Sequence, residues 1–75
     1  MNIQQVVGDN VRFIRESRDW TQEDLAIVAK VSKTYIGQVE RGETAVTITV
    51  LHRIAKALKT DIALLVTKDG YKRLE

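Results

Sequence analysis

The chain has 75 residues, which is enough for one small domain and no more. A domain of this size buries only about 60% of the surface that its unfolded chain exposes, so its stability is marginal unless its helices pack well. The absence of cysteine excludes disulfides and thiolate metal sites, and a single histidine excludes a histidine-rich metal site. A net charge of +2 permits binding to nucleic acid without indicating it.

The apolar content of 44% is that of a globular chain and is too high for a disordered one. The longest apolar runs, such as that from Ile62 to Val66, are far shorter than the roughly 20 residues needed to span a bilayer. The first five residues lack the basic start and apolar block of a signal peptide. We therefore expect a cytoplasmic protein.

The first predicted helix runs from about Ile3 to Ser17, where apolar residues are spaced as on one helical face. Asn2 is placed to cap the start of this helix. Gly8 lies inside the segment, where glycine costs roughly 1 kcal/mol relative to alanine. We therefore expect a loose first turn.

A second helix is predicted from Thr21 to about Ala29, and clear local signals mark its start. The residues Thr21-Gln22-Glu23-Asp24 form a capping box, whose two acids also favour the positive end of a helix. Trp20 and Leu25 have the spacing of a hydrophobic staple. We expect Trp20 to fill the core between the first two helices.

A third helix is predicted after a turn of only three residues, Lys30-Val31-Ser32. Ser32 caps this helix, which runs to about Arg41 and stops at Gly42. Because so short a connection leaves no slack for antiparallel packing, the second and third helices must cross steeply.

Two more helices are predicted in the C-terminal half of the chain, the first of them capped by Thr47. Its inward face is expected to consist of Ile48, Leu51, Ile54, Ala55 and Leu58. Thr60 or Asp61 caps a short fifth helix from Ile62 to Val66, a run whose composition alone would also suit a strand. The chain is therefore predicted to be all-α, with a turn at Lys68-Asp69-Gly70 before a short tail.

The third helix has two faces of different character. At about 100° per residue, Ile36 and Val39 lie together and anchor the helix to the core. The opposite face carries Lys33, Thr34, Gly37, Gln38 and Arg41. A polar face often reflects solvent exposure alone, but this one contains no acid, although acids make up 10 of the 75 residues. Its glutamine, lysine and threonine also match the side chains that read adenine, guanine and thymine.

Several blocks of sequence have a characteristic order and spacing. They are Val7-Gly8, Arg12-Phe13-Ile14-Arg15-Glu16, Thr21-Gln22-Glu23-Asp24-Leu25-Ala26, Tyr35-Ile36-Gly37-Gln38-Val39-Glu40-Arg41-Gly42 and Leu51-His52-Arg53-Ile54-Ala55-Lys56-Ala57-Leu58. Together they resemble the Cro/repressor-type (XRE-like) helix-turn-helix family of transcriptional regulators. The resemblance covers about residues 7–66 of a single domain, residues 1–75, in which 67–75 form a C-terminal tail.

This resemblance implies a compact five-helix, lambda-repressor-like domain with its helix-turn-helix at the second and third helices. The third helix would lie in the major groove of double-stranded DNA. The base-reading residues would be Lys33, Thr34 and Gln38, with Gly37 beside them. The phosphate-contacting residues would be Gln22, Ser32, Tyr35 and Arg41.

The chain departs from the family pattern in its turns. Lys30 stands where the family usually has glycine, so a left-handed backbone there would be mildly strained. Asp19 and Lys59 replace two further turn glycines, and Val46 stands where proline is usual. Since none of these residues touches the base-reading face, we expect them to affect local stability more than function.

Family members resembling this chain pair the positions of Arg15 and Glu40 in a partly buried salt bridge. Arg15 follows Ile14 on the edge of the first helix's apolar stripe, and Glu40 is similarly placed beside Val39. A bidentate pair would fix the third helix against the first. The alternative is two surface charges that never meet.

The C-terminal segment carries more apolar side chains than a monomer of this size needs to cover. We expect Leu64, Val66, Tyr71 and Leu74 to form the interface of a two-fold homodimer. Such a dimer would present two recognition helices about 34 Å apart. The alternative is a monomer whose tail folds over its own core.

The sequence therefore predicts a dimeric, sequence-specific DNA-binding transcriptional regulator of a pseudo-palindromic operator. Chains of this kind resemble phage repressors and restriction–modification controller proteins. The sequence contains no catalytic or phosphate-loop motif. We expect His52 to be an exposed helical side chain without metal partners. We expect no enzyme activity, cofactor, metal, small-molecule ligand or membrane partner. The alternative function is an antitoxin or protein-interaction module with the same fold.

Overall fold

Five α-helices and a short 3-10 helix make up the computed structural model, which describes residues 2–74. They are α1 (Ile3–Ser17), α2 (Gln22–Ala29), α3 (Lys33–Glu40), α4 (Ile48–Leu58), α5 (Ile62–Leu65) and η1 (Gly70–Arg73). The predicted all-α fold is confirmed, and the run that would also suit a strand is helical up to Leu65. None of these helices is both long enough and apolar enough to cross a membrane.

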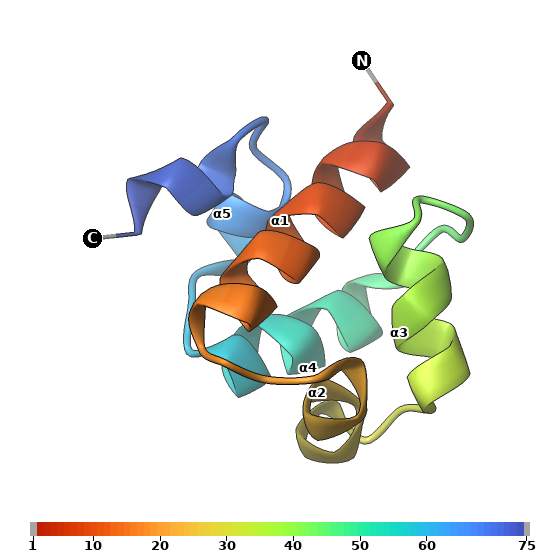
Figure 1. The fold of residues 1–75 in the computed structure, drawn as a ribbon. Helices are drawn as coiled ribbons and strands as arrows, with labels where there is room; N and C mark the ends of the chain where they lie inside the picture. Colours follow the sequence, from red (N-terminus) through yellow and green to blue (C-terminus); the bar gives the residue numbers. More distant parts are fainter. Residues whose placement is uncertain (1, 75) are drawn as a thin grey trace.

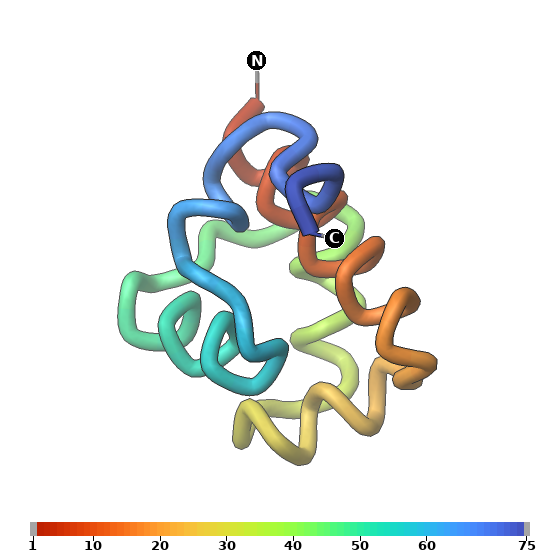
Figure 2. Tube along the Cα trace, turned by 90° about the vertical axis from the view of Figure 1, so that its left-hand side faces the viewer, coloured from red at the N-terminus to blue at the C-terminus, as the bar shows by residue number. Residues whose placement is uncertain are grey.

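The long α1 lies across the molecule, with α3 against one side and the C-terminal α5 and η1 against the other (Figure 1). The short α2 follows α1 after a short linker and packs on both α3 and α4. Figure 2 shows the first turns of α1 and the C-terminal segment side by side. The arrangement leaves α3 at the edge of the molecule, with one face free.

The helices start where local sequence chemistry places them. The side chains of Asn2, Thr21, Ser32 and Thr47 each accept a hydrogen bond from a backbone N–H in the first turn of their helix. At Thr21 both halves of the capping box are present. Of the two candidate caps for the fifth helix, Thr60 and Asp61, the cap is Asp61. Its carboxylate accepts a hydrogen bond from the backbone N–H of Ala63 at 3.2 Å.

The core is centred on side chains from α1, α2, α3, α4 and α5. The largest side chains below 2% exposure are Val11, Ile14, Leu25, Ile36, Val39, Ile54, Leu58, Leu65 and the polar Asn10. Trp20 is partly buried and packs against this cluster, as expected. The predicted inward position of Ile48 is wrong, because its side chain is 76% exposed. It belongs to the first turn of α4, beside an open hollow, whereas Ala57 in the last turn is buried instead.

The expectation of a loose first turn caused by Gly8 is also wrong. The structure shows that Gly8 allows two helices to pack closely. It is buried where α1 meets the end of α3. A Cβ at this position would lie 2.8 Å from the carbonyl oxygen of Glu40 and closer still to that of Val39. Because both neighbours are backbone atoms that cannot rotate away, only glycine allows this approach of the two helices.

The turn residues Asp19, Lys30 and Lys59 all adopt the left-handed conformation, with φ of 58°, 62° and 56°. The helix-turn-helix turn therefore keeps the usual backbone geometry without the usual glycine. An L-residue with a Cβ is disfavoured in this region by roughly 1–2 kcal/mol, whereas glycine is not.

We expect Lys30→Gly and Lys59→Gly each to raise the free energy of unfolding by about 0.5–1 kcal/mol, because relief of strain outweighs the added flexibility of the unfolded chain. Thermal unfolding checks this. The matched control is Lys56→Gly inside α4, which should lower stability by about 1 kcal/mol. A lower melting temperature for Lys59→Gly would contradict the strain argument.

The C-terminal segment is held to its own chain. The buried amide of Asn10 donates to the carbonyl oxygens of Leu65 at 3.1 Å and Thr67 at 2.9 Å, and its oxygen accepts from the backbone N–H of Tyr71 at 2.9 Å. The Tyr71 ring stacks on Phe13, with 4.4 Å between ring centroids. Tyr71 and Leu74 thus cover the protein's own core. This is the alternative arrangement, in which the tail folds over its own chain and does not form the dimer interface.

Candidate nucleic-acid interface

The exposed face of α3 carries the side chains that the sequence singled out. Ile36 and Val39 are buried and hold the helix to the body of the protein. On the opposite side Lys33 and Thr34 are exposed and Gln38 is half-buried. The hydrogen-bonding groups of this face therefore remain available to a partner.

A shallow hollow joins this face to the start of α2. It is lined by Gln22, Lys33, Thr34, Gly37 and Arg41. Gly37 is buried because Arg41 folds across it: a Cβ on Gly37 would lie 3.1 Å from a terminal guanidinium nitrogen of Arg41. The hollow thus combines expected base-reading residues with expected phosphate-contacting residues from two helices. Gln38 lies outside it.

The other two expected phosphate contacts are placed at the start and flank of α3. The hydroxyl oxygen of Ser32 accepts a hydrogen bond from the backbone N–H of Tyr35 at 3.0 Å, which caps the helix. A hydroxyl that accepts in this way still has a proton to donate. The Tyr35 side chain is partly buried against the core, which restricts its freedom at the edge of the site.

The expected Arg15–Glu40 pair is present behind the site. The guanidinium of Arg15 donates to both carboxylate oxygens of Glu40, at 2.7 Å through Nε and 3.0 Å through Nη2. The exposed fractions of the two side chains are only 10% and 2%. Hydrogen bonding to Glu40 raises the pKa of Arg15 above its ordinary value, so the guanidinium remains charged at neutral pH.

Two further members of this network could not be found from sequence patterns. The third guanidinium nitrogen of Arg15 donates to the backbone oxygen of Trp20 at 2.7 Å, which fixes the chain just before α2. The side-chain amide of Gln22 donates to Glu40 at 3.0 Å. One buried carboxylate therefore connects α1, the start of α2 and the end of α3, and it orients the amide expected to contact phosphate.

Arg41 has a partner that the sequence reasoning missed. Its guanidinium donates to the carboxylate of Glu43 at 2.9 Å, and both side chains are exposed. Glu43 lies beyond the end of α3, so the periodicity of the helix gives no sign that it faces Arg41. Hydrogen bonding from Arg41 lowers the pKa of Glu43, and the carboxylate is therefore charged at neutral pH and competes with any phosphate for Arg41.

We expect Glu43→Gln to increase affinity for duplex DNA by about two- to fivefold, because Arg41 is then free to contact phosphate. Fluorescence anisotropy at low and moderate salt measures this. The control is Asp69→Asn, which removes the same charge from the C-terminal segment and should have a smaller effect. Equal gains from both variants would mean that only net charge matters and that Arg41 does not reach the DNA.

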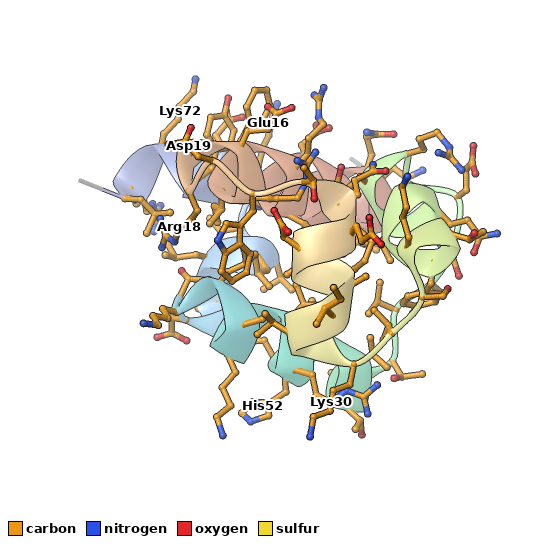
Figure 3. The ribbon with its side chains drawn as sticks, turned by 60° about the horizontal axis from the view of Figure 1, so that its bottom comes forward. Glu16, Arg18, Asp19, Lys30, His52 and Lys72 are labelled. Carbon is orange, nitrogen blue, oxygen red and sulfur yellow. The ribbon has the colours of Figure 1, made fainter. Side chains whose placement is uncertain are left out.

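No group of three or more histidine, aspartate and glutamate side chains able to hold a metal is found in residues 2–74. His52 is exposed on α4, at the side of the molecule to which Lys30 also points (Figure 3).

Comparisons with known proteins agree with this architecture. A family model described as helix-turn-helix matches residues 11–65. The control protein C.SmaI of Serratia marcescens is 42% identical over 72 residues, which cover 96% of this chain and 86% of the relative. The control protein C.BamHI of Bacillus amyloliquefaciens is 40% identical over 58 residues, covering 76% and 72%.

A solved structure extends the likeness to three dimensions. The restriction-modification controller protein C.AhdI from Aeromonas hydrophila superimposes with a TM-score of 0.80 at 29% identity. The match covers 83% of this chain and 94% of that protein.

Proposed function

This chain belongs to the helix-turn-helix family, and from that premise we propose that it binds double-stranded DNA as a sequence-specific transcriptional regulator of the restriction–modification controller kind. The observation that carries the proposal is the exposed face of α3, which contributes no acidic residue of its own and is continuous with the start of α2. The two relatives described as control proteins support the controller role.

In this proposal α3 enters the major groove. Lys33 suits the hydrogen-bond acceptors of guanine, and Gln38 suits the edge of adenine. The methyl group of Thr34 suits the methyl group of thymine. Gln22, Ser32, Tyr35 and Arg41 would fix the register by contacting phosphates without reading sequence. Because α3 is anchored through Ile36 and Val39, these side chains would enter the groove on a rigid support.

We propose that two copies bind a pseudo-palindromic operator through an interface centred on an apolar face formed by Ile3, Ile48 and Val66. These are exposed aliphatic side chains around one hollow, although they come from three separate parts of the chain. Of the four interface residues expected from sequence, Val66 belongs to this face, Leu64 is partly buried outside it, and Tyr71 and Leu74 contact their own core. Burial of such a patch is a common basis of association.

The dimer is tested by light scattering at tens of micromolar protein. We expect a dimeric mass for the unmodified chain and a monomeric mass for Ile48→Asp. The matched control is Ile27→Asp on α2, which introduces the same charge at a similarly exposed isoleucine outside the apolar face and should remain dimeric. A monomer before any substitution contradicts the proposal.

DNA binding is tested by its dependence on salt. Each phosphate contacted by a cation should contribute a slope of about −0.9 to the plot of log affinity against log salt concentration. Arg41→Ala should reduce that slope, whereas Lys33→Ala should relax sequence preference at the position that Lys33 reads. Binding that is indifferent to salt, or untouched by changes at Lys33, Thr34 and Gln38, would instead favour a protein-interaction module.

A further inference from the structure

We propose that a second surface, between the end of α2 and the middle of α4, binds an acidic segment of a protein partner in which carboxylates alternate with aliphatic side chains. The surface is a hollow, called the basic hollow below, lined by Val28, Ala29, Lys30, Arg53, Lys56 and Ala57. It shares no lining residue with the hollow on α3. The proposal does not depend on DNA binding.

The charge of the basic hollow is uncompensated. Lys30, Arg53 and Lys56 form no ion pair within residues 2–74. The sequence from 44 to 60, which includes the whole of α4, contains no acid. The acids of α2, Glu23 and Asp24, lie in its first turn at the other end of the helix. A ligand that complements this surface must therefore bring negative charge.

Arg53 carries an unused donor at the wall of the hollow. Its Nε is shielded from solvent and has no hydrogen-bond acceptor among residues 2–74. A buried donor without a partner is unfavourable, and a planar guanidinium satisfies such a donor best by binding a carboxylate through two parallel hydrogen bonds. A small rotation of the side chain towards an entering carboxylate would provide this arrangement.

The apolar part of the surface indicates a protein ligand and not a nucleic acid. Val28 in the hollow is 51% exposed, and the adjacent Ile27 is 69% exposed. Aliphatic side chains gain little from a phosphate backbone but bury well against other aliphatic side chains. Cations around an exposed valine therefore complement a segment that carries both carboxylates and aliphatic groups.

The position of the basic hollow allows it to be used while DNA is bound. Lys30 follows the last residue of α2, whereas Gln22, in the hollow on α3, is the first. Eight helical residues separate the two ends of α2 by about 12 Å. In Figure 3 Lys30 and His52 point to the same side of the molecule, from the end of α2 and from α4. A partner held in the basic hollow would leave the start of α2 and the residues that line the hollow on α3 outside the lining it occupies.

The test is a titration of the full, isotope-labelled chain with a short synthetic peptide of alternating glutamate and leucine, followed by amide chemical shifts. We expect saturable shifts concentrated at Val28, Lys30, Arg53 and Lys56. The same peptide with glutamine in place of glutamate should bind about tenfold more weakly or less. Absence of shifts at millimolar peptide, or equal binding of the two peptides, overturns the proposal.

The matched variants separate local contact from overall charge. Arg53→Gln with Lys56→Gln should weaken peptide binding about tenfold, whereas Lys68→Gln with Arg73→Gln, which removes the same charge elsewhere, should leave it within about twofold. Equal losses in both variants overturn the proposal. If a duplex oligonucleotide displaces the peptide and shifts the same four amides, the basic hollow is a DNA contact and the protein-partner proposal is wrong.

Discussion

Replacing Glu40 with alanine should lower the free energy of unfolding by about 3–5 kcal/mol, because the charge of Arg15 would be left buried without its partner. A domain of this size has only about 4–11 kcal/mol in total. Each kcal/mol corresponds to about 4–8 °C in the melting temperature of a small domain, so the loss should be plain in a thermal scan. DNA affinity should also fall, because Gln22 loses the acceptor that orients it.

Two further variants distinguish charge from packing. Glu40→Gln keeps the shape of the side chain and one hydrogen-bond acceptor, so it should be less destabilising than Glu40→Ala. Joint replacement of Arg15 by methionine and Glu40 by leucine removes both charges, and it should recover most of the stability, since buried pairs contribute little over apolar residues of similar volume. That double variant should still bind DNA poorly, because the link from Glu40 to Gln22 is gone. Unchanged thermal stability of Glu40→Ala would refute the pairing.

Replacing Asn10 with alanine should cost about 3 kcal/mol, because three buried or partly buried backbone groups lose their partner together. These groups are the carbonyl oxygens of Leu65 and Thr67 and the amide of Tyr71. The loss should be accompanied by faster hydrogen exchange of the Tyr71 amide, since the C-terminal segment is released from α1.

The control for this prediction is Asn10→Asp. A carboxylate can accept from the Tyr71 amide but cannot donate to the two carbonyl oxygens, so this variant should be as destabilising as alanine or more so. If the alanine variant unfolds at the original temperature, or if exchange accelerates equally throughout the chain, Asn10 does not hold the C-terminal segment.

The helices were predictable because the signals that define them are local. Thr21, Ser32 and Thr47 each cap the helix that follows in sequence, and a cap requires only a side-chain oxygen near the first free N–H groups. The face of α3 followed from the spacing of Ile36 and Val39. The Arg15–Glu40 pair came from the family resemblance, since charge spacing alone does not bring residues on different helices together.

The remaining features depend on contacts between distant segments. Gly8 looks like a weak point within a helix until the carbonyl groups of α3 are placed against it. Ile48 fits the apolar period of α4, yet its first turn extends beyond the core. Asn10 gives no sign in sequence that its partners lie 55 to 61 residues away. Periodicity describes one helix at a time and cannot supply these relations.

The central claim is that the Lys33–Thr34–Gln38 edge of α3 reads base pairs. It is tested most directly by selecting bound duplexes from random DNA with the unmodified protein and with Gln38→Ala. The account predicts two related half-sites in the first selection, and in the second the same site with sequence preference lost at one symmetric pair of positions. Affinity for the original site should fall by about 1–3 kcal/mol. Identical preferences for both proteins, or no enriched site for either, would contradict it.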